Sequence, residues 1–105
     1  MAYFDKLRQE LEQFKKKNAN ELEFRPIEKW MVGKLGVERL PSKGGSHVYF
    51  KHRILEQWNC TGHFQVSLKK GSKKAIIYRK NFLEYLYKSL KLIIDLLEQE
   101  AASEE

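Results

Sequence analysis

At 105 residues, with 42% hydrophobic and 12% aromatic side chains, the chain is long enough for one domain with its own core and too apolar to be disordered over most of its length. The single cysteine, Cys60, excludes an internal disulfide and suits a reducing compartment. The net charge of +6 becomes +10 without residues 98–105, which hold four glutamates and no Lys or Arg. This basic body favours a polyanionic partner such as a nucleic acid, and a merely well-solvated surface is the alternative.

The sequence shows no signal peptide and no membrane-spanning segment. Asp5 and Glu10 interrupt any apolar run near the start, and Asp95 breaks the longest apolar stretch. We therefore expect a soluble, cytoplasmic protein without a membrane partner.

Two helices are expected in the first third of the chain. Apolar residues recur there at helical spacing: Phe4, Leu7, Leu11 and Phe14. We treat residues 1–20 as an added N-terminal helix with its end near Asn18–Asn20. A second helix is predicted to start near Pro26, because proline is favoured at the first helical position, and to end at Gly36, where a left-handed C-cap is needed.

Three strands follow, at 37–40, 46–52 and 63–69, where apolar and polar residues alternate. Residues 53–62 between the last two strands are expected to be irregular. Residues 75–78 form either a fourth short strand or the approach to the last helix, and the pattern leaves both open.

A long C-terminal helix completes the order. Asn81 and Glu84 resemble a capping box, although the helix can also begin a turn earlier, near Tyr78. We expect a single α+β domain over residues 1–99, with helices packed on one face of a three-stranded antiparallel sheet, and an acidic flexible tail at 100–105.

The outward face of that sheet collects polar and basic groups. Strand alternation places on it, from the two longer strands, His47, Tyr49, Lys51, His63, Gln65, Ser67 and Lys69. Aromatic rings stack on bases and cations hold phosphates, so this face suits single-stranded or distorted RNA. An ordinary solvated sheet face is the alternative.

Two other chemistries are weighed against RNA binding. A zinc site would need His47, His52, Cys60 and His63, but their spacing matches no compact zinc pattern and strand parity points His52 away from His47. Cys60 lacks an activating neighbour, which favours an inert thiol over a nucleophile. We expect neither a metal nor a cofactor.

The order of these features resembles the HicA toxin family, whose members pair with HicB antitoxins. The resemblance covers about residues 20–97. It rests on Trp30–Gly36, the strand 37–40, Lys43 with the glycine turn, and above all Gly45-Ser46-His47 followed by Tyr49-Phe50 and His52. A Lys-rich loop and the C-terminal helix after Tyr78-Arg79-Lys80 complete it.

The resemblance implies a double-stranded-RNA-binding-domain-like fold and a metal-independent endoribonuclease, an mRNA interferase of a type II toxin–antitoxin system with a HicB-like antitoxin as partner. The histidine after Gly-Ser, His47, would be the catalytic acid or base, a role that suits the ordinary titration range of histidine. His63 is either a second catalytic group or a surface residue. From strand geometry and the basic loop we expect RNA contacts from Lys43, Gly45, Ser46, Tyr49, Lys51, His63, Lys69, Lys70, Lys73 and Lys74.

Two functions without catalysis remain open from the sequence. One is an RNA-binding module of the same fold that works without His47. The other is a protein-interaction domain whose basic face meets only an acidic protein.

Overall fold

The computed structural model describes residues 2–17, 22–41, 47–57, 62–68, 76–77 and 80–103. Its helices are α1 (Ala2–Lys17), α2 (Phe24–Trp30) and α3 (Lys80–Ser103). A π-helical segment, Met31–Leu35, continues α2, and a 3₁₀ helix spans Arg53–Gln57. The strands are β1 (Leu22–Glu23), β2 (Glu38–Arg39), β3 (His47–Lys51), β4 (His63–Ser67) and β5 (Ile76–Ile77).

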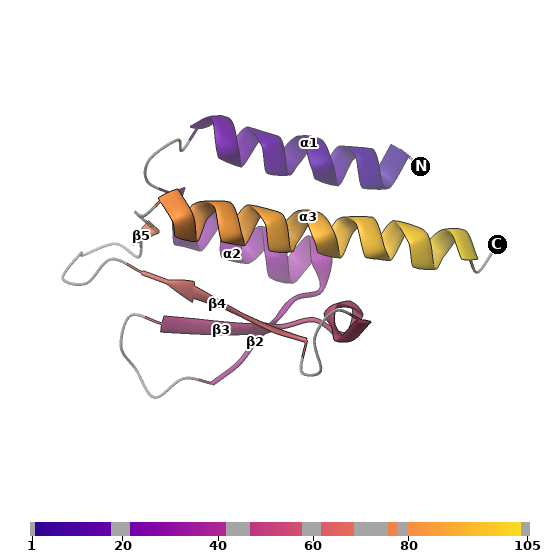
Figure 1. The fold of residues 1–105 in the computed structure, drawn as a ribbon. Helices are drawn as coiled ribbons and strands as arrows, with labels where there is room; N and C mark the ends of the chain where they lie inside the picture. Colours follow the sequence, from indigo (N-terminus) through magenta and orange to yellow (C-terminus); the bar gives the residue numbers. More distant parts are fainter. Residues whose placement is uncertain are drawn as a thin grey trace.

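The main sheet has the order β2-β3-β4 and is antiparallel throughout. Val48 and Phe50 of β3 are buried, whereas His47 and Tyr49 between them are exposed, as period-two alternation requires. All three helices lie on the same side of this sheet, so its other side is uncovered by them (Figure 1). The predicted α+β architecture with a three-stranded antiparallel sheet is therefore confirmed.

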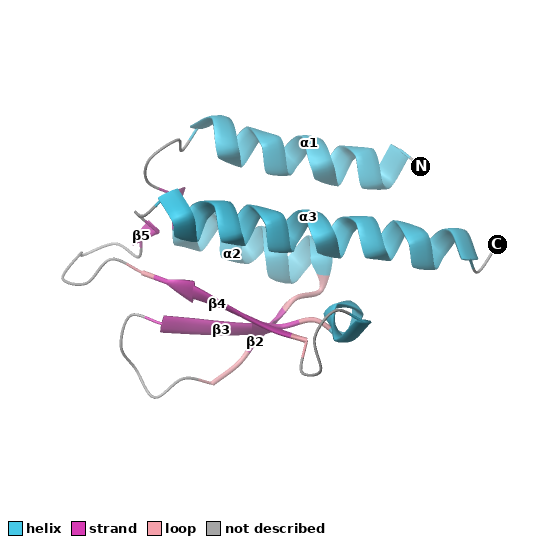
Figure 2. Ribbon diagram, viewed as in Figure 1, coloured by secondary structure: helices cyan, strands magenta, loops and turns pink. Residues whose placement is uncertain are grey.

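The added helix α1 packs on α3 and not on the sheet (Figure 2). Arg8 of α1 donates to Asp95 and Glu98 of α3 over 2.8 and 2.7 Å. Phe14 meets Trp30 edge to face with ring centroids 5.8 Å apart. The N-terminal helix is thus fixed on the side of the molecule opposite to the uncovered sheet face.

The core lies between the sheet and the helices. Phe50 is fully buried at its centre and stacks on Phe64 with ring centroids 5.4 Å apart. The same hydrophobic core includes fully buried apolar side chains from the helices and from β5, among them Leu7, Ile27, Met31, Ile77, Leu86, Leu90 and Ile94. Burying one such side chain contributes roughly 1.5–3 kcal/mol, so this layer holds β3 and β4 firmly in place.

The structure differs from the sequence predictions in the segments that connect the main elements. Residues 76–77 form strand β5, and its partner β1 is a strand that the sequence pattern does not reveal, with Leu22 opposite Ile77. Residues 53–57 are helical and not irregular, because Ile54 and Leu55 turn inward to the core. α2 begins two residues before Pro26, which still lies in the first turn, where the missing N–H costs nothing.

The ends of two helices also bear on the predictions. Gly36 has φ 74°, so it is the left-handed C-cap that the sequence predicts. α3 continues through Ser103, beyond Glu100, where the sequence predicts a flexible tail. Arg53 makes a bidentate ion pair with Glu100 at 2.7 and 2.6 Å, which ties this last part of α3 to the 3₁₀ helix.

Over the described residues, no helix combines the length and the apolar character that crossing a bilayer needs.

Candidate functional site

The side of the main sheet that faces away from the helices carries polar, basic and aromatic side chains. We call it the open sheet face, and it consists of His47, Tyr49, Lys51, His63, Gln65 and Ser67. His47, Tyr49, His63 and Gln65 are exposed, and Lys51 and Ser67 are half-buried. Because the opposite faces of β3 and β4 are buried in the core, these side chains stand on a firm backbone.

His47 is held at one of its two ring nitrogens. Gln65 Nε2 lies 2.6 Å from Nδ1 of His47 and donates to it, and the Ser67 hydroxyl oxygen lies 3.1 Å from the same nitrogen. Among the described residues, no hydrogen bond reaches the other nitrogen, Nε2. β4 therefore holds the ring at Nδ1, and the donor at Nδ1 places the proton of the neutral ring on Nε2.

His63 does not meet His47. The register places Ser67 opposite His47 and His63 opposite Lys51, at the far end of the same pair of strands. Four strand positions correspond to about 13 Å, which is too far for the two rings to act on one phosphodiester. The register therefore argues against His63 as a catalytic partner of His47 and leaves it as a residue of the open sheet face.

Tyr49 and Lys51 continue the open sheet face along β3 from His47. Tyr49 lies opposite Gln65 and is 40% exposed, so part of its ring is open to solvent. A tyrosine ring in this setting offers a surface for stacking a base, and the ammonium group of Lys51 offers a charge for a phosphate. His47, Tyr49 and Lys51 thus lie in order at alternate positions of one strand.

His52 lies on the opposite face, as strand parity predicts. It is only 6% exposed, and its Nε2–H donates to the Leu35 carbonyl over 2.7 Å while Nδ1 accepts from the Ile54 N–H over 3.0 Å. Burial lowers the pKa of His52, and the bond to the Leu35 carbonyl opposes this shift in part. His52 is therefore a neutral structural histidine that joins the end of β3 to the π-helical segment.

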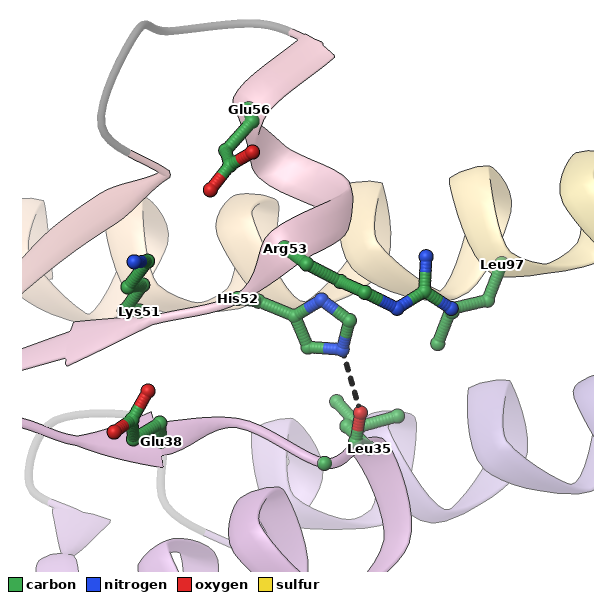
Figure 3. A pocket seen from close by; sticks show the side chains of 8 residues that line it. Leu35, Glu38, Lys51, His52, Arg53, Glu56 and Leu97 are labelled. Carbon is green, nitrogen blue, oxygen red and sulfur yellow. Dashed lines mark hydrogen bonds between the residues drawn. The ribbon is translucent and has the colours of Figure 1, made fainter.

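A pocket of about 470 Å³ lies at the Lys51 end of β3 (Figure 3). It is lined by Leu35, Gly36, Glu38, Lys51, His52, Arg53, Glu56 and Leu97. Its walls carry both signs of charge, and His47 is not among them. The pocket therefore adjoins the open sheet face at Lys51 and does not contain His47.

The zinc arrangement finds no geometric support. His47 and His52 point to opposite sides of the sheet, and Cys60 is outside the described residues. Within the part of the chain that the structure describes, no three His, Cys, Asp or Glu side chains come close enough together to hold a metal ion.

Several residues predicted to contact RNA cannot be placed, because they lie outside the described residues: Lys43, Gly45, Ser46, Lys69, Lys70, Lys73 and Lys74. The structure brings together His47, Tyr49 and Lys51 on one strand. It adds Gln65 and Ser67 as direct partners of His47, a role that the sequence does not assign. Alternation placed both on the correct face, but only the register reveals that they reach the ring.

Comparison of the chain with models of known protein families, with curated proteins and with solved structures found no match. The resemblance to the HicA family therefore rests on the motif residues themselves, and the function is argued from the open sheet face.

Proposed function

We propose that this protein is a metal-independent endoribonuclease of the HicA type, in which His47 is the general acid or base. The observation that carries the proposal is the His47 ring, held at Nδ1 by Gln65 and Ser67 and open at Nε2, on an uncovered sheet face. The Gly45-Ser46-His47 motif and the order of the elements support it independently.

The reaction is an internal transesterification of RNA. The 2′-oxygen of a ribose bonds to the adjacent phosphorus, the bond from phosphorus to the 5′-oxygen breaks, and a 2′,3′-cyclic phosphate and a 5′-hydroxyl result. One proton leaves the 2′-hydroxyl and one joins the 5′-oxygen. Nε2 of His47 takes up the first when the neutral ring carries its proton on Nδ1, or supplies the second from the imidazolium, and water exchanges the other. A positioned acid or base of this kind contributes typically ~10²–10⁴-fold in rate.

Two other residues of the open sheet face, Tyr49 and Lys51, hold the RNA strand. Tyr49 stacks on a base, and Lys51 neutralises a phosphate further along the strand. The basic residues Lys43, Lys69, Lys70, Lys73 and Lys74 extend the positive charge, and Lys43, Lys51 and Lys69 are the candidates for stabilising the charge that develops on phosphorus. The order of a helix, three antiparallel strands and a helix within residues 24–103 supports the double-stranded-RNA-binding-domain-like fold that the resemblance implies.

A HicB-like antitoxin is the partner protein of this proposal. The chain without its last eight residues carries a net charge of +10, so an acidic protein surface would be attracted to it. An antitoxin that covers His47 and Tyr49 would exclude mRNA from the open sheet face. Such a pair is the arrangement of a type II toxin–antitoxin system.

The test is incubation of the purified protein with a structured mRNA in EDTA, beside His47→Ala and the matched control His63→Ala. We expect cleavage by the wild type and by His63→Ala, and a loss of at least ~10²-fold in His47→Ala. Binding of RNA by all three proteins without cleavage would refute the catalytic proposal and establish a noncatalytic RNA-binding module. Failure to bind RNA at moderate salt would leave the protein-interaction domain.

A further inference from the structure

We propose that Gln65 and Ser67 are positioning residues that hold Nδ1 of His47 in both protonation states of the ring, so that Nε2 is the atom that exchanges a proton with RNA. The inference rests on the proposed ribonuclease function. It assigns to β4 a role in the reaction that the motif on β3 does not contain.

The register of the two strands explains why both side chains reach one nitrogen. Ser67 is directly opposite His47, so its short side chain suffices to bring the hydroxyl oxygen within 3.1 Å of Nδ1. Gln65 is opposite Tyr49, which makes it the diagonal neighbour of His47, and its longer side chain spans the larger distance to reach within 2.6 Å. Two partners from one strand fix both the rotation and the tilt of the imidazole.

The chemistry of the two partners suits a ring that changes its charge. In the observed arrangement the Gln65 amide nitrogen donates to Nδ1, which places the proton of the neutral ring on Nε2. Turning the amide by 180° presents its oxygen instead, which accepts a proton from Nδ1 of the other neutral form or of the imidazolium. The Ser67 hydroxyl can likewise donate or accept. Exchange of a proton at Nε2 runs between the neutral form with its proton on Nδ1 and the imidazolium. Once the amide has turned, its oxygen and the Ser67 hydroxyl oxygen can therefore accept from Nδ1–H both before and after Nε2 gains its proton.

Different side chains at position 65 would break this balance in different ways. Leucine can neither donate nor accept, so the ring would lose one of its two restraints. Glutamate accepts only, so it would favour the imidazolium and hold the proton on the ring to a higher pH. The two substitutions thus separate positioning from a merely structural contribution of the side chain.

The experiment measures kcat and KM for RNA cleavage in EDTA between pH 5 and 9 for the wild type and four variants. Gln65→Leu, Gln65→Glu and Ser67→Ala alter the partners of His47. The matched control is Gln9→Leu, which makes the same change on the exposed surface of α1, on the far side of the molecule. Because all three changed residues are outside the buried core, circular dichroism should show the same fold for every protein.

We expect Gln65→Leu and Ser67→Ala to lower kcat about fivefold each with little change in KM, which corresponds to the net worth of about one hydrogen bond. Gln65→Glu should move the histidine-dependent midpoint of the pH–rate profile to higher pH. Gln9→Leu should behave as the wild type.

Two results would overturn the inference while the proposed function stands. The first is an active wild type with unchanged kcat and pH profile in Gln65→Leu and Gln65→Glu. The second is a loss confined to KM, which would make Gln65 a direct RNA contact and not a positioning residue. A wild type that leaves RNA uncut would refute the proposed function and this inference with it.

Discussion

Replacing His52 with leucine should destabilise the protein strongly, although His52 takes no part in the proposed chemistry. The change leaves the Leu35 carbonyl and the Ile54 N–H buried without their hydrogen-bond partner. Each buried group left unpaired costs about 1–3 kcal/mol, so the expected loss is roughly 2–6 kcal/mol. Domains of this size are stable by only about 5–15 kcal/mol, so the variant loses a large share of its free energy of unfolding.

The same histidine should make stability depend on pH. Its pKa is lowered by burial in the folded protein and is about 6.5 in the unfolded chain, so the unfolded state binds the proton more readily. The stabilisation is fully present above about pH 6.5. It is lost progressively as the pH falls from there through the lowered pKa of the folded state. His52→Leu should remove this part of the acid sensitivity.

Urea unfolding at pH 7.5 and pH 5 measures both effects in one experiment, with the exposed His47→Leu as the matched control. We expect a much lower midpoint for His52→Leu at pH 7.5 and a smaller difference between the two pH values than in the wild type. The control should lose no more than about 1–2 kcal/mol, the net worth of the hydrogen bonds of His47 to Gln65 and Ser67, and should keep its acid sensitivity. Equal midpoints for His52→Leu and the wild type would refute the assignment of His52 as a neutral structural link.

Three further changes test other parts of the structure. Gly62→Ala should destabilise the protein far more than Gly36→Ala in thermal unfolding. Both glycines have positive φ, but only at Gly62 would an added Cβ lie 2.7 Å from the backbone oxygen of His52. Equal losses of stability in the two variants would contradict this. Arg8→Gln removes the ion pairs between α1 and two carboxylates of α3, so amide hydrogen exchange should become faster in α1 and stay unchanged in α3. Unchanged exchange rates in α1 would show that apolar packing alone holds α1 on α3. Lys51→Gln should reduce the slope of log K for RNA against log salt by about 0.7, as expected for one lost phosphate contact on a single strand, and an unchanged slope would remove Lys51 from the interface.

The sequence predicts well on which side of the sheet each strand residue lies. It predicts poorly which residues of the next strand lie beside it. Alternation places Val48 and Phe50 inward and His47 and Tyr49 outward because side-chain direction is a local property of a strand. The left-handed backbone conformation of Gly36 is likewise predicted from the local sequence at the end of a helix. The register that brings Gln65 to His47 depends on how two strands align, and no local pattern contains that information.

The remaining differences come from contacts between distant parts of the chain. β1 and β5 are two-residue strands that form only because Leu22 and Ile77 meet across more than 50 positions. His52 is polar by type, and its burial follows from backbone groups of the π-helical segment and the 3₁₀ helix that need its two nitrogens. α3 extends past the predicted start of the tail, where Glu100 meets Arg53.

The most direct test of the proposed transesterification is to compare cleavage of one RNA with cleavage of its fully 2′-O-methylated counterpart by the wild-type protein in EDTA. We expect cuts only in the unmodified RNA, with 2′,3′-cyclic phosphate and 5′-hydroxyl ends, because the attacking 2′-oxygen must be free. Cleavage of both substrates at equal rates would contradict the mechanism, since it would mean that water and not the 2′-hydroxyl attacks the phosphorus.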